Sequence, residues 1–352
     1  MSEPSELSEP SFYQYPLNPK LYNTPFHTGS LADKKFLITG GAGFIGSNIV
    51  EYLLRYGAEK VRVLDNLSNG YFENIEEFIS LPNFEFIQGD IRDLTTCKQA
   101  VQGIDYVTHQ AALGSVPRSI KDPITSSAVN IAGHLNMLVA VKENKRVKRM
   151  VYAASSSTYG DSSDLPKVEG NEGKPLSPYS VTKAVNEMYA EVFSKTYGFH
   201  TIGLRYFNVF GPKQNPDNPY AAVIPIFCQA FMEGKQPTIN GDGKTSRDFT
   251  FVENAVQANI RAMLLPKLAQ HEILNTACGD QISLNEIITM LQQMTKKDVK
   301  PVYGPERPGD VKHSRASIDK ITRLLGYQPT VRFLEGLELV YEWYQSKNKP
   351  AK

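Results

Sequence analysis

Short apolar runs alternate with longer amphipathic stretches over residues 35 to about 207. The apolar runs predict strands at Lys35–Thr39, Lys60–Asp65, Phe84–Ile87, Ile104–His109, Met150–Ala154 and Leu204–Phe207. Helical spacing predicts helices between them, among others at Ser47–Tyr56, Asn130–Glu143 and Thr182–Tyr197. Strands that alternate with helices favour a Rossmann-like α/β fold with a doubly wound parallel sheet.

The pattern changes after about residue 207, where glycine, proline and charge become denser. We therefore expect a Rossmann domain over 31–207 and a smaller C-terminal α/β substrate domain over 208–352. Part of 245–275, centred on Phe249–Leu265, is expected to pack back on the first domain. Residues 1–30 read as an N-terminal extension that lies over the body through its aromatic side chains, Phe12, Tyr13, Tyr15, Tyr22 and Phe26.

The amino-acid composition excludes several classes of function. The 352 residues include 38 Lys and Arg against 37 Asp and Glu, so no broad field is available to hold nucleic acid or an anionic membrane surface. The three cysteines match no metal-ligand spacing, and their sparse, odd number suits a reducing cytosol. No stretch resembles a signal peptide or a membrane span. We expect a cytoplasmic protein without a metal.

Gly40, Gly43 and Gly46 form a glycine-rich turn between a predicted strand and a predicted helix. In a dinucleotide site the first glycine makes the turn, the second admits the pyrophosphate, and the third lets helix and strand pack closely. The helix N-terminus, with Phe44 and Ile45, then faces the phosphates. Glycine-rich turns also have purely structural uses, but this context favours a dinucleotide.

Asp65 lies 19 residues after Gly46, at the end of the second strand, where it can accept hydrogen bonds from an adenosine ribose. A carboxylate there repels a 2′-phosphate, so we predict NAD rather than NADP; the alternative is that Asp65 only caps its own turn. Asp90 and Ile91 would frame the adenine, although Asp90 could equally be a turn residue. The predicted cofactor site also includes Asn66, Ser68 and Gly70.

Tyr179 and Lys183 are four residues apart, so on a helix they share a face. The lysine ammonium would favour the phenolate, and a phenol of pKa ~10 becomes a useful base only when that value falls. Tyrosine and lysine also fall four apart by chance on many helices. Their place downstream of the glycine turn favours catalysis.

Further motifs follow in a fixed order: His109-Gln110-Ala111-Ala112, Ser155-Ser156-Ser157-Thr158-Tyr159-Gly160, Arg205-Tyr206-Phe207-Asn208, Ser246-Arg247-Asp248-Phe249 and Arg307-Pro308-Gly309-Asp310. With the glycine turn and the Tyr179/Lys183 pair, they resemble the extended short-chain dehydrogenase/reductase family and, within it, the nucleotide-sugar 4-epimerases. The resemblance runs from Lys35 to about Pro329. The pattern is most similar to bacterial UDP-GlcNAc 4-epimerases of surface-polysaccharide pathways.

The resemblance implies roles for individual residues. Tyr179 would be the base, Lys183 its electrostatic partner and a ligand of the nicotinamide ribose, and Ser155 a hydrogen-bond partner of the reacting oxygen. Asn130 would support the site from a helix. The remaining cofactor contacts would be Gln110, Ala111, Ala112 and Tyr206. A homodimer would form through Asp122–Glu143 and Tyr179–Tyr197, as in many relatives.

The serine run separates two reactions. The 4,6-dehydratases of the family carry Thr-Asp-Glu where this chain has Ser155-Ser156-Ser157, because elimination of water needs a further acid and base. The resemblance therefore implies an isomerase that oxidises C4 and returns the same hydride. Alternatives are a UDP-glucuronate decarboxylase, for which Arg118 is available, and a non-catalytic dinucleotide sensor, against which the intact Tyr179/Lys183 pair argues.

The substrate side also follows from the resemblance. Arg247 and Arg307 would clamp the pyrophosphate of a UDP-sugar, Asp310 would bind the uridine ribose, and Asn208 would touch a phosphate or sugar oxygen. The other predicted substrate residues are Gly114, Ser115, Ser155, Ser156, Ser157, Val223, Thr238, Asn240 and Ser314.

Two of these positions bear on the sugar. The glucose enzymes often have Lys at the position of Gly114 and Tyr at that of Ser314, seven after Arg307. Small residues at both leave room for an acetamido group, so UDP-GlcNAc and UDP-GalNAc are the expected substrates. Neutral packing variation is the alternative, with UDP-Glc/UDP-Gal or UDP-GlcNAcA as substrates.

Overall fold

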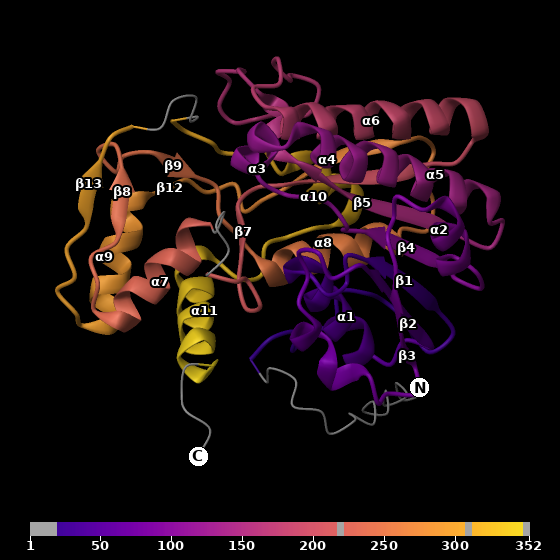
Figure 1. The fold of residues 1–352 in the computed structure, drawn as a ribbon, viewed down its shortest axis with the longest axis horizontal. Coiled ribbons are helices and arrows are strands. Elements are labelled where there is room, and N and C mark those ends of the chain that lie inside the picture. The colour runs from indigo at the N-terminus through magenta and orange to yellow at the C-terminus, as the bar shows by residue number, and fades with distance from the viewer. Residues whose placement is uncertain (1–19, 217–221, 307–311, 348–352) are drawn as a thin grey trace, which may run out of the picture.

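A seven-stranded, all-parallel sheet forms the centre of the molecule in a computed structural model that describes residues 20–216, 222–306 and 312–347 (Figure 1). The strand order is β11-β6-β5-β4-β1-β2-β3. The strands are β1 (Lys35–Thr39), β2 (Lys60–Asp65), β3 (Phe84–Gln88), β4 (Tyr106–His109), β5 (Arg149–Ser155), β6 (Thr201–Tyr206) and β11 (Glu272–Thr276). The order reverses between β1 and β4, which is where doubly wound sheets bind ligands. The predicted fold is confirmed.

Helices cover both faces of this sheet. Phe36 and Ile38 of β1 point into one apolar layer with α1 (Phe44–Arg55) and α8 (Val252–Met263). Leu37, between them, points into the other layer. That layer is formed by α2 (Leu94–Ala100), α5 (Gly133–Glu143) and α6 (Pro178–Tyr197). Alternate strand residues thus serve opposite layers, as expected for a sheet buried on both faces.

Smaller elements complete the fold. Around the large sheet are α3 (Val116–Lys121), α4 (Pro123–Ser127), a π-helical turn η3 (Ala128–Ala132), and the 3-10 helices η1 (Phe72–Asn74), η2 (Glu76–Phe78) and η4 (Ser156–Tyr159). The later elements are β7 (Val209–Phe210), α7 (Val223–Glu233), β8 (Thr238–Asn240), β9 (Ser246–Arg247), β10 (Thr250–Phe251), β12 (Ile282–Ser283), α9 (Leu284–Thr295), β13 (Val302–Gly304), α10 (Asp319–Leu325) and α11 (Phe333–Lys347).

All six predicted strands are present, but the sheet has a seventh that the sequence pattern did not reveal. This strand, β11, has only five residues and pairs with β6. The chain therefore returns to the large sheet after residue 207, and α8 packs on β4, β5 and β6 as expected for Phe249–Leu265. The limits of the two predicted domains stay a prediction.

The described part of the N-terminal extension packs on the Rossmann unit through two predicted aromatics. Tyr22 donates a hydrogen bond to Asn48 Oδ1 at 2.7 Å, and its backbone N–H donates to Glu253 Oε2 at 2.9 Å. Phe26 stacks on Tyr52 with ring centroids 5.1 Å apart. Phe12, Tyr13 and Tyr15 lie outside the described residues.

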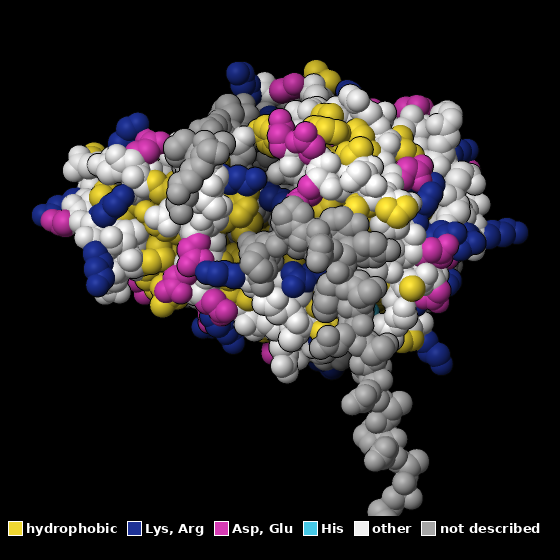
Figure 2. Space-filling model, turned by 90° about the horizontal axis from the view of Figure 1, so that it is seen from below, with side chains coloured by type: hydrophobic (Ala, Val, Ile, Leu, Met, Phe, Trp, Pro, Cys, Tyr) yellow, Lys and Arg dark blue, Asp and Glu magenta, His cyan; other side chains and the backbone are white. Residues whose placement is uncertain are grey.

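The charged side chains of the described residues are mixed in sign on one face of the molecule. On the face shown in Figure 2, Lys and Arg are interspersed with Asp and Glu. Within the described ranges, one helical stretch, Pro123–Glu143, is long and apolar enough to cross a membrane, but 44% of its most apolar window is buried inside the molecule. Core helices of soluble proteins pass the same test of length and apolar composition, so this stretch is weak evidence for a membrane span. No metal-binding cluster of His, Cys, Asp and Glu occurs among the described residues.

Candidate active site

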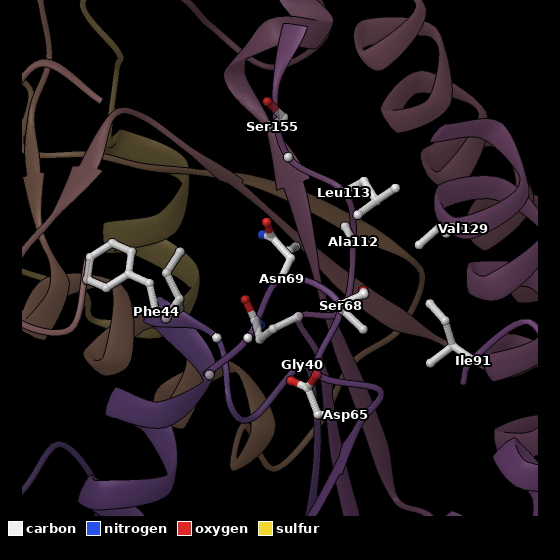
Figure 3. A pocket seen from close by; sticks show the side chains of 18 of the residues that line it. Gly40, Phe44, Asp65, Ser68, Asn69, Ile91, Ala112, Leu113, Val129 and Ser155 are labelled. Carbon is white, nitrogen blue, oxygen red and sulfur yellow. The ribbon is translucent and has the colours of Figure 1, made fainter. Parts of the chain in front are cut away.

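A pocket of about 470 Å³ opens at the carboxyl ends of β1 to β5, at the reversal of strand order (Figure 3). Most of the predicted cofactor residues line it: Gly40, Gly43, Phe44, Ile45, Gly46, Asp65, Asn66, Ser68, Gly70, Asp90, Ile91, Gln110, Ala111, Ala112, Tyr179, Lys183 and Tyr206. Of the predicted substrate residues, Gly114, Ser155, Ser156 and Asn208 line the same pocket. Two groups identified separately in the sequence thus meet in one cavity.

Glycine is required at two positions of this turn, because other backbone atoms approach them too closely for a side chain. A Cβ on Gly46 would lie 2.1 Å from the carbonyl oxygen of Gly40, and one on Gly40 would lie 2.6 Å from the Ala111 nitrogen. Gly40 also has a φ of +69°. Gly43 is the N-cap of α1 and makes no side-chain cap, so the first N–H groups of the helix remain available at the pocket wall. These features fit a dinucleotide pyrophosphate.

Asp65 and Asp90 both line the pocket and hold their own turns. Asp65 accepts hydrogen bonds from the N–H groups of Ala42 at 3.0 Å and Leu67 at 2.8 Å. Asp90 pairs with Arg92 and accepts from Asn66, and these contacts hold its pKa at about 2. The turn contacts of both carboxylates are therefore observed, and their contacts with the cofactor stay a prediction, with which the remaining lone pairs of a carboxylate are compatible.

Three predicted catalytic side chains meet where β5 faces the start of α6. Ser177 caps α6 by accepting from the Ser180 N–H at 3.1 Å, and the backbone N–H of Tyr179 donates to Ser119 Oγ at 3.0 Å. Tyr179 and Ser155 line the same pocket, and Ser155 acts to lower the pKa of the Tyr179 hydroxyl. Lys183 donates from Nζ to the Ala153 carbonyl at 2.7 Å. One helix thus aims both the phenol and the amine at the end of β5.

The electrostatics of this cluster differ from the sequence-based expectation. Burial raises the pKa of Tyr179, with the Ser155 hydrogen bond opposing it, and burial lowers the pKa of Lys183 to about 8, with Glu187 opposing it. Lys183 Nζ lies 5.9 Å from the Tyr179 ring centroid and is directed to a carbonyl. In the protein without ligands, desolvation therefore outweighs the predicted lowering of the phenol pKa.

Several predicted residues lie away from the pocket lining. Asn130 sits behind it: its Oδ1 accepts from the Leu113 N–H at 2.8 Å and its Nδ2 donates to Thr182 Oγ1 at 3.1 Å. The following residues also lie outside the lining: Ser115, Ser157, Val223, Thr238, Asn240, Arg247 and Ser314. Arg307 and Asp310 lie outside the described residues. Sequence reasoning missed Leu64, Asn69, Gly89, Leu113, Val129, Ala153, Ala154 and Val209, most of which adjoin recognised motifs.

The predicted substrate half converges on the buried carboxylate of Asp248, next to Arg247. Asp248 accepts backbone hydrogen bonds from Cys278 at 3.0 Å, Gly279 at 3.0 Å and Ala316 at 3.2 Å. Its own carbonyl accepts from Asn208 Nδ2 at 3.0 Å. Asp248 thus joins three chain segments and fixes the backbone beside Arg247.

A nucleotide-binding turn with a Ser–Tyr–Lys cluster at the switch point defines a nicotinamide-dependent enzyme of the short-chain dehydrogenase/reductase kind. Comparison with known proteins agrees. A family model described as GDP-mannose 4,6 dehydratase matches residues 37–340. The chain belongs to this extended short-chain dehydrogenase/reductase family of nucleotide-sugar epimerases and dehydratases. The predicted class, an NAD-dependent enzyme of nucleotide-sugar chemistry, is confirmed.

Individual relatives differ in the sugar they are named for. A UDP-glucuronate 4-epimerase of Thermodesulfobacterium geofontis is 34% identical, over 88% of this chain and 95% of its own length. A UDP-N-acetylglucosamine 4-epimerase structure from Methanobrevibacter ruminantium, in complex with UDP-N-acetylmuramic acid, superposes with a TM-score of 0.84 at 37% identity, covering 90% of this chain and 99% of that one. A UDP-glucuronic acid 4-epimerase structure from Bacillus cereus, with UDP-glucuronic acid and NAD, gives 0.83 at 33%, covering 89% and 99%.

Asp248 gives the folded protein a specific pH dependence. Burial raises its pKa from 3.8 to about 7, so between these values the folded state holds a proton that the unfolded chain has lost. This contribution to stability is present below pH 3.8 and is lost as pH rises towards 7, at up to about 1.4 kcal/mol per pH unit. Asp248→Asn should flatten the fall in unfolding free energy over this window, measured by urea denaturation. Asp280→Asn, at a half-exposed neighbour, is the control; an unchanged slope in Asp248→Asn would contradict the assignment.

Proposed function

We propose that this protein is an NAD-dependent 4-epimerase of UDP-N-acetylhexosamines, interconverting UDP-GlcNAc and UDP-GalNAc through a transient 4-keto sugar. The observation that carries the proposal is that Ser155, Tyr179 and Lys183 meet in the same pocket as the glycine turn. The relatives named as UDP-sugar 4-epimerases support it.

The chain's own residues supply the proton chemistry. Tyr179 Oη takes the proton of the sugar 4-hydroxyl and later returns it, while Ser155 holds the same oxygen by a hydrogen bond. The glycine turn, Asp65 and Lys183 would hold NAD, which when bound would supply a positively charged acceptor for the C4 hydride and the donor for its return. A cation near Tyr179 favours the phenolate, so ligand binding would offset the burial that raises the phenol pKa.

The serine run supports epimerisation without loss of water. Ser156 lines the pocket but has no group that titrates near neutral pH. Ser157 Oγ is buried and has no hydrogen-bond partner among the described residues. Neither can replace the acid and base that elimination requires, so the 4-keto sugar would be reduced again instead.

Open space at Gly114 supports an acetamido sugar. A Cβ added at this pocket residue would meet no atom within 4 Å, so nothing from the described chain fills the volume. The role of Ser314 rests on the family resemblance. A substrate with a C6 carboxylate is the second candidate, because Asn69 lines the pocket and its Oδ1 accepts a hydrogen bond from Arg118 Nη2 at 3.0 Å, which holds a cation next to a lining residue.

Exposed apolar side chains on α3, α4 and α6 support a homodimer. Ile120 and Ile124 are 64% and 81% exposed, and Met188 and Val192 of α6 are more than half exposed. α4 and α6 pack side by side (Figure 1), and all four side chains are exposed. A second copy of this face would cover it.

Replacing Tyr179 by Phe tests the reaction. The variant keeps the ring but removes the hydroxyl, so it should retain NAD and lose at least about 100-fold in turnover. NMR would follow wild type and variant with UDP-GlcNAc, UDP-Glc and UDP-GlcNAcA in parallel. If wild type interconverts none of these sugars, the function is wrong; if the variant is fully active, the base is wrong.

Replacing Gly114 by Lys tests the sugar preference. The new side chain would occupy the free volume, so kcat/KM for UDP-GlcNAc should fall about tenfold or more relative to UDP-Glc. Gly114→Ala is the matched control and should change the ratio little, since its Cβ meets nothing. Equal ratios in wild type and the lysine variant would refute this role.

Charges on the apolar face should block self-association. Ile124→Asp combined with Met188→Asp would bury carboxylates at the proposed interface and yield a monomer in light scattering. Leu334→Asp, at a 48% exposed position on α11, is the control and should leave the mass unchanged. A wild-type monomer would refute the dimer.

A further inference from the structure

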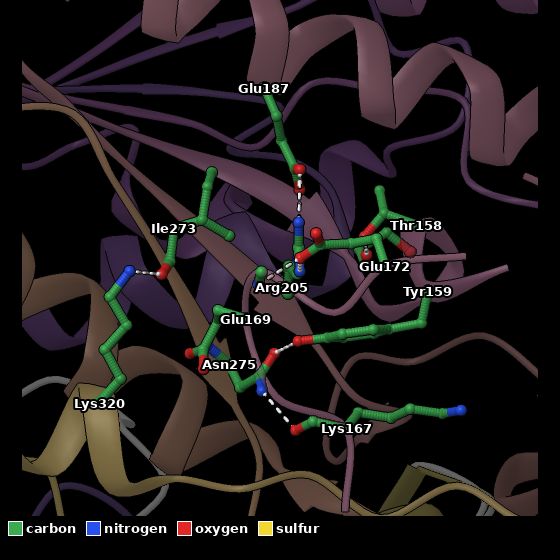
Figure 4. A network of polar contacts seen from close by, with 12 residues as sticks. Thr158, Tyr159, Lys167, Glu169, Glu172, Glu187, Arg205, Ile273, Asn275 and Lys320 are labelled. Carbon is green, nitrogen blue, oxygen red and sulfur yellow. Dashed lines mark hydrogen bonds and ion pairs between the residues drawn. The ribbon is translucent and has the colours of Figure 1, made fainter. Parts of the chain in front are cut away.

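Arg205 of β6 is a buried cation that holds two carboxylates (Figure 4). Its Nε and Nη2 donate to the two carboxylate oxygens of Glu187 at 2.9 and 2.7 Å. Its Nη1 pairs with Glu172, which lies on the loop before α6. The Arg205 side chain is only 4% exposed, so this is an interior ion pair with two-pronged geometry.

The same network reaches the strand that ends in Ser155. The Arg205 guanidinium lies 4.8 Å from the Tyr159 ring centroid, and the Tyr159 hydroxyl donates to Asn275 Oδ1 at 2.7 Å. Tyr159 belongs to η4, which starts directly after Ser155, and Asn275 belongs to β11. Arg205 therefore joins β6, β11, η4 and α6.

Glu187 lies one helical turn after Lys183, on the same face of α6. The other titratable groups that face Lys183 are Tyr179 on α6, His109 on β4 and His134 on α5. Burial lowers the pKa of His109 to about 3 and lowers that of His134 as well, so both are neutral near pH 7. Glu187 is thus the carboxylate that favours the ammonium of Lys183.

We propose that Arg205 and Glu187 act together as a positioning pair for Lys183. Arg205 fixes the Glu187 carboxylate one turn behind the amine, where it stabilises the ammonium without binding it. Among the described residues no ion pair joins Glu187 and Lys183, and Lys183 Nζ instead donates to the Ala153 carbonyl. The amine therefore stays at the pocket. This inference rests on the proposed role of Lys183 beside the base.

The pair matters because Lys183 is close to losing its proton. Burial lowers its pKa to about 8 and Glu187 raises it, so removing the Glu187 charge lowers the value further. Arg205 would then also be less neutralised, which acts in the same direction. A larger fraction of Lys183 would then be neutral near pH 7.5, and the residue would favour the phenolate less.

The test is the titration of Lys183 followed by NMR of protein labelled at lysine Cε, with the Lys183 signal identified by Lys183→Met. Glu187→Gln should lower the pKa by about 0.5–1 pH unit, and Glu187→Asp, which keeps the charge, should restore most of it. Glu172→Gln is the matched control: it also removes one carboxylate from Arg205 but should shift Lys183 by less than half as much. No shift in Glu187→Gln, or equal shifts in both Gln variants, would overturn the proposal.

A second variant decides the matter if Glu187→Gln does not fold. Arg205→Lys keeps the positive charge but loses the two-pronged contact with Glu187. Glu187 can then approach Lys183, so the pKa of Lys183 should rise. An unchanged or lowered value would overturn the proposal. The alkaline limb of the kcat profile should move with each titration. Because the NMR titration needs no turnover, an inactive wild type would refute the proposed function and leave this inference standing on its own result.

Discussion

The hydrogen bond from Lys183 Nζ to the Ala153 carbonyl is the contact on which the site depends. It fastens the first turns of α6 to the end of β5, so that Tyr179, one turn earlier, reaches Ser155. The contact also brings an amine into a buried place, where a charge is costly unless it is paired or hydrogen-bonded. Glu187, which is paired with Arg205, opposes the effect of burial on Lys183.

Without ligands, the pocket disfavours charge on both Tyr179 and Lys183. Burial raises the pKa of Tyr179 and lowers that of Lys183 to about 8, so burial disfavours the charged form of each group, although Lys183 stays mostly protonated near pH 7. Activation of the phenol therefore has to come with the ligands, through a cation brought close to Tyr179. A pocket that keeps its base neutral until then limits unproductive proton transfer.

Sequence patterns predicted the sheet and most of the pocket for a physical reason. Glycines at a tight turn, strand-end carboxylates and an i, i+4 pair are local signals, and the parallel sheet brings strand ends together. Long-range partners leave no such signal: β11 is short and gains its place by pairing with β6, and Asn130 faces Leu113 and Thr182 only after α6 has docked. Arg205 was recognised as part of a motif, but its pairing with Glu187 and Glu172 depends on three separate elements.

The family model that matches this chain is described as GDP-mannose 4,6 dehydratase. The proposed epimerisation begins with the same step, oxidation at C4, but does not continue to loss of water. Oxidation at C4 needs only a base, a hydride acceptor and a hydrogen bond to the oxygen, and in the proposed mechanism Tyr179 would be the base and Ser155 would supply the hydrogen bond. Elimination needs an additional acid and base within reach of the sugar, and the two positions after Ser155 hold hydroxyls, one of them buried without a hydrogen-bond partner in the described part of the chain. In the proposed reaction, a 4-keto sugar would meet no additional acid or base at the two positions after Ser155, so its reduction from either face would follow.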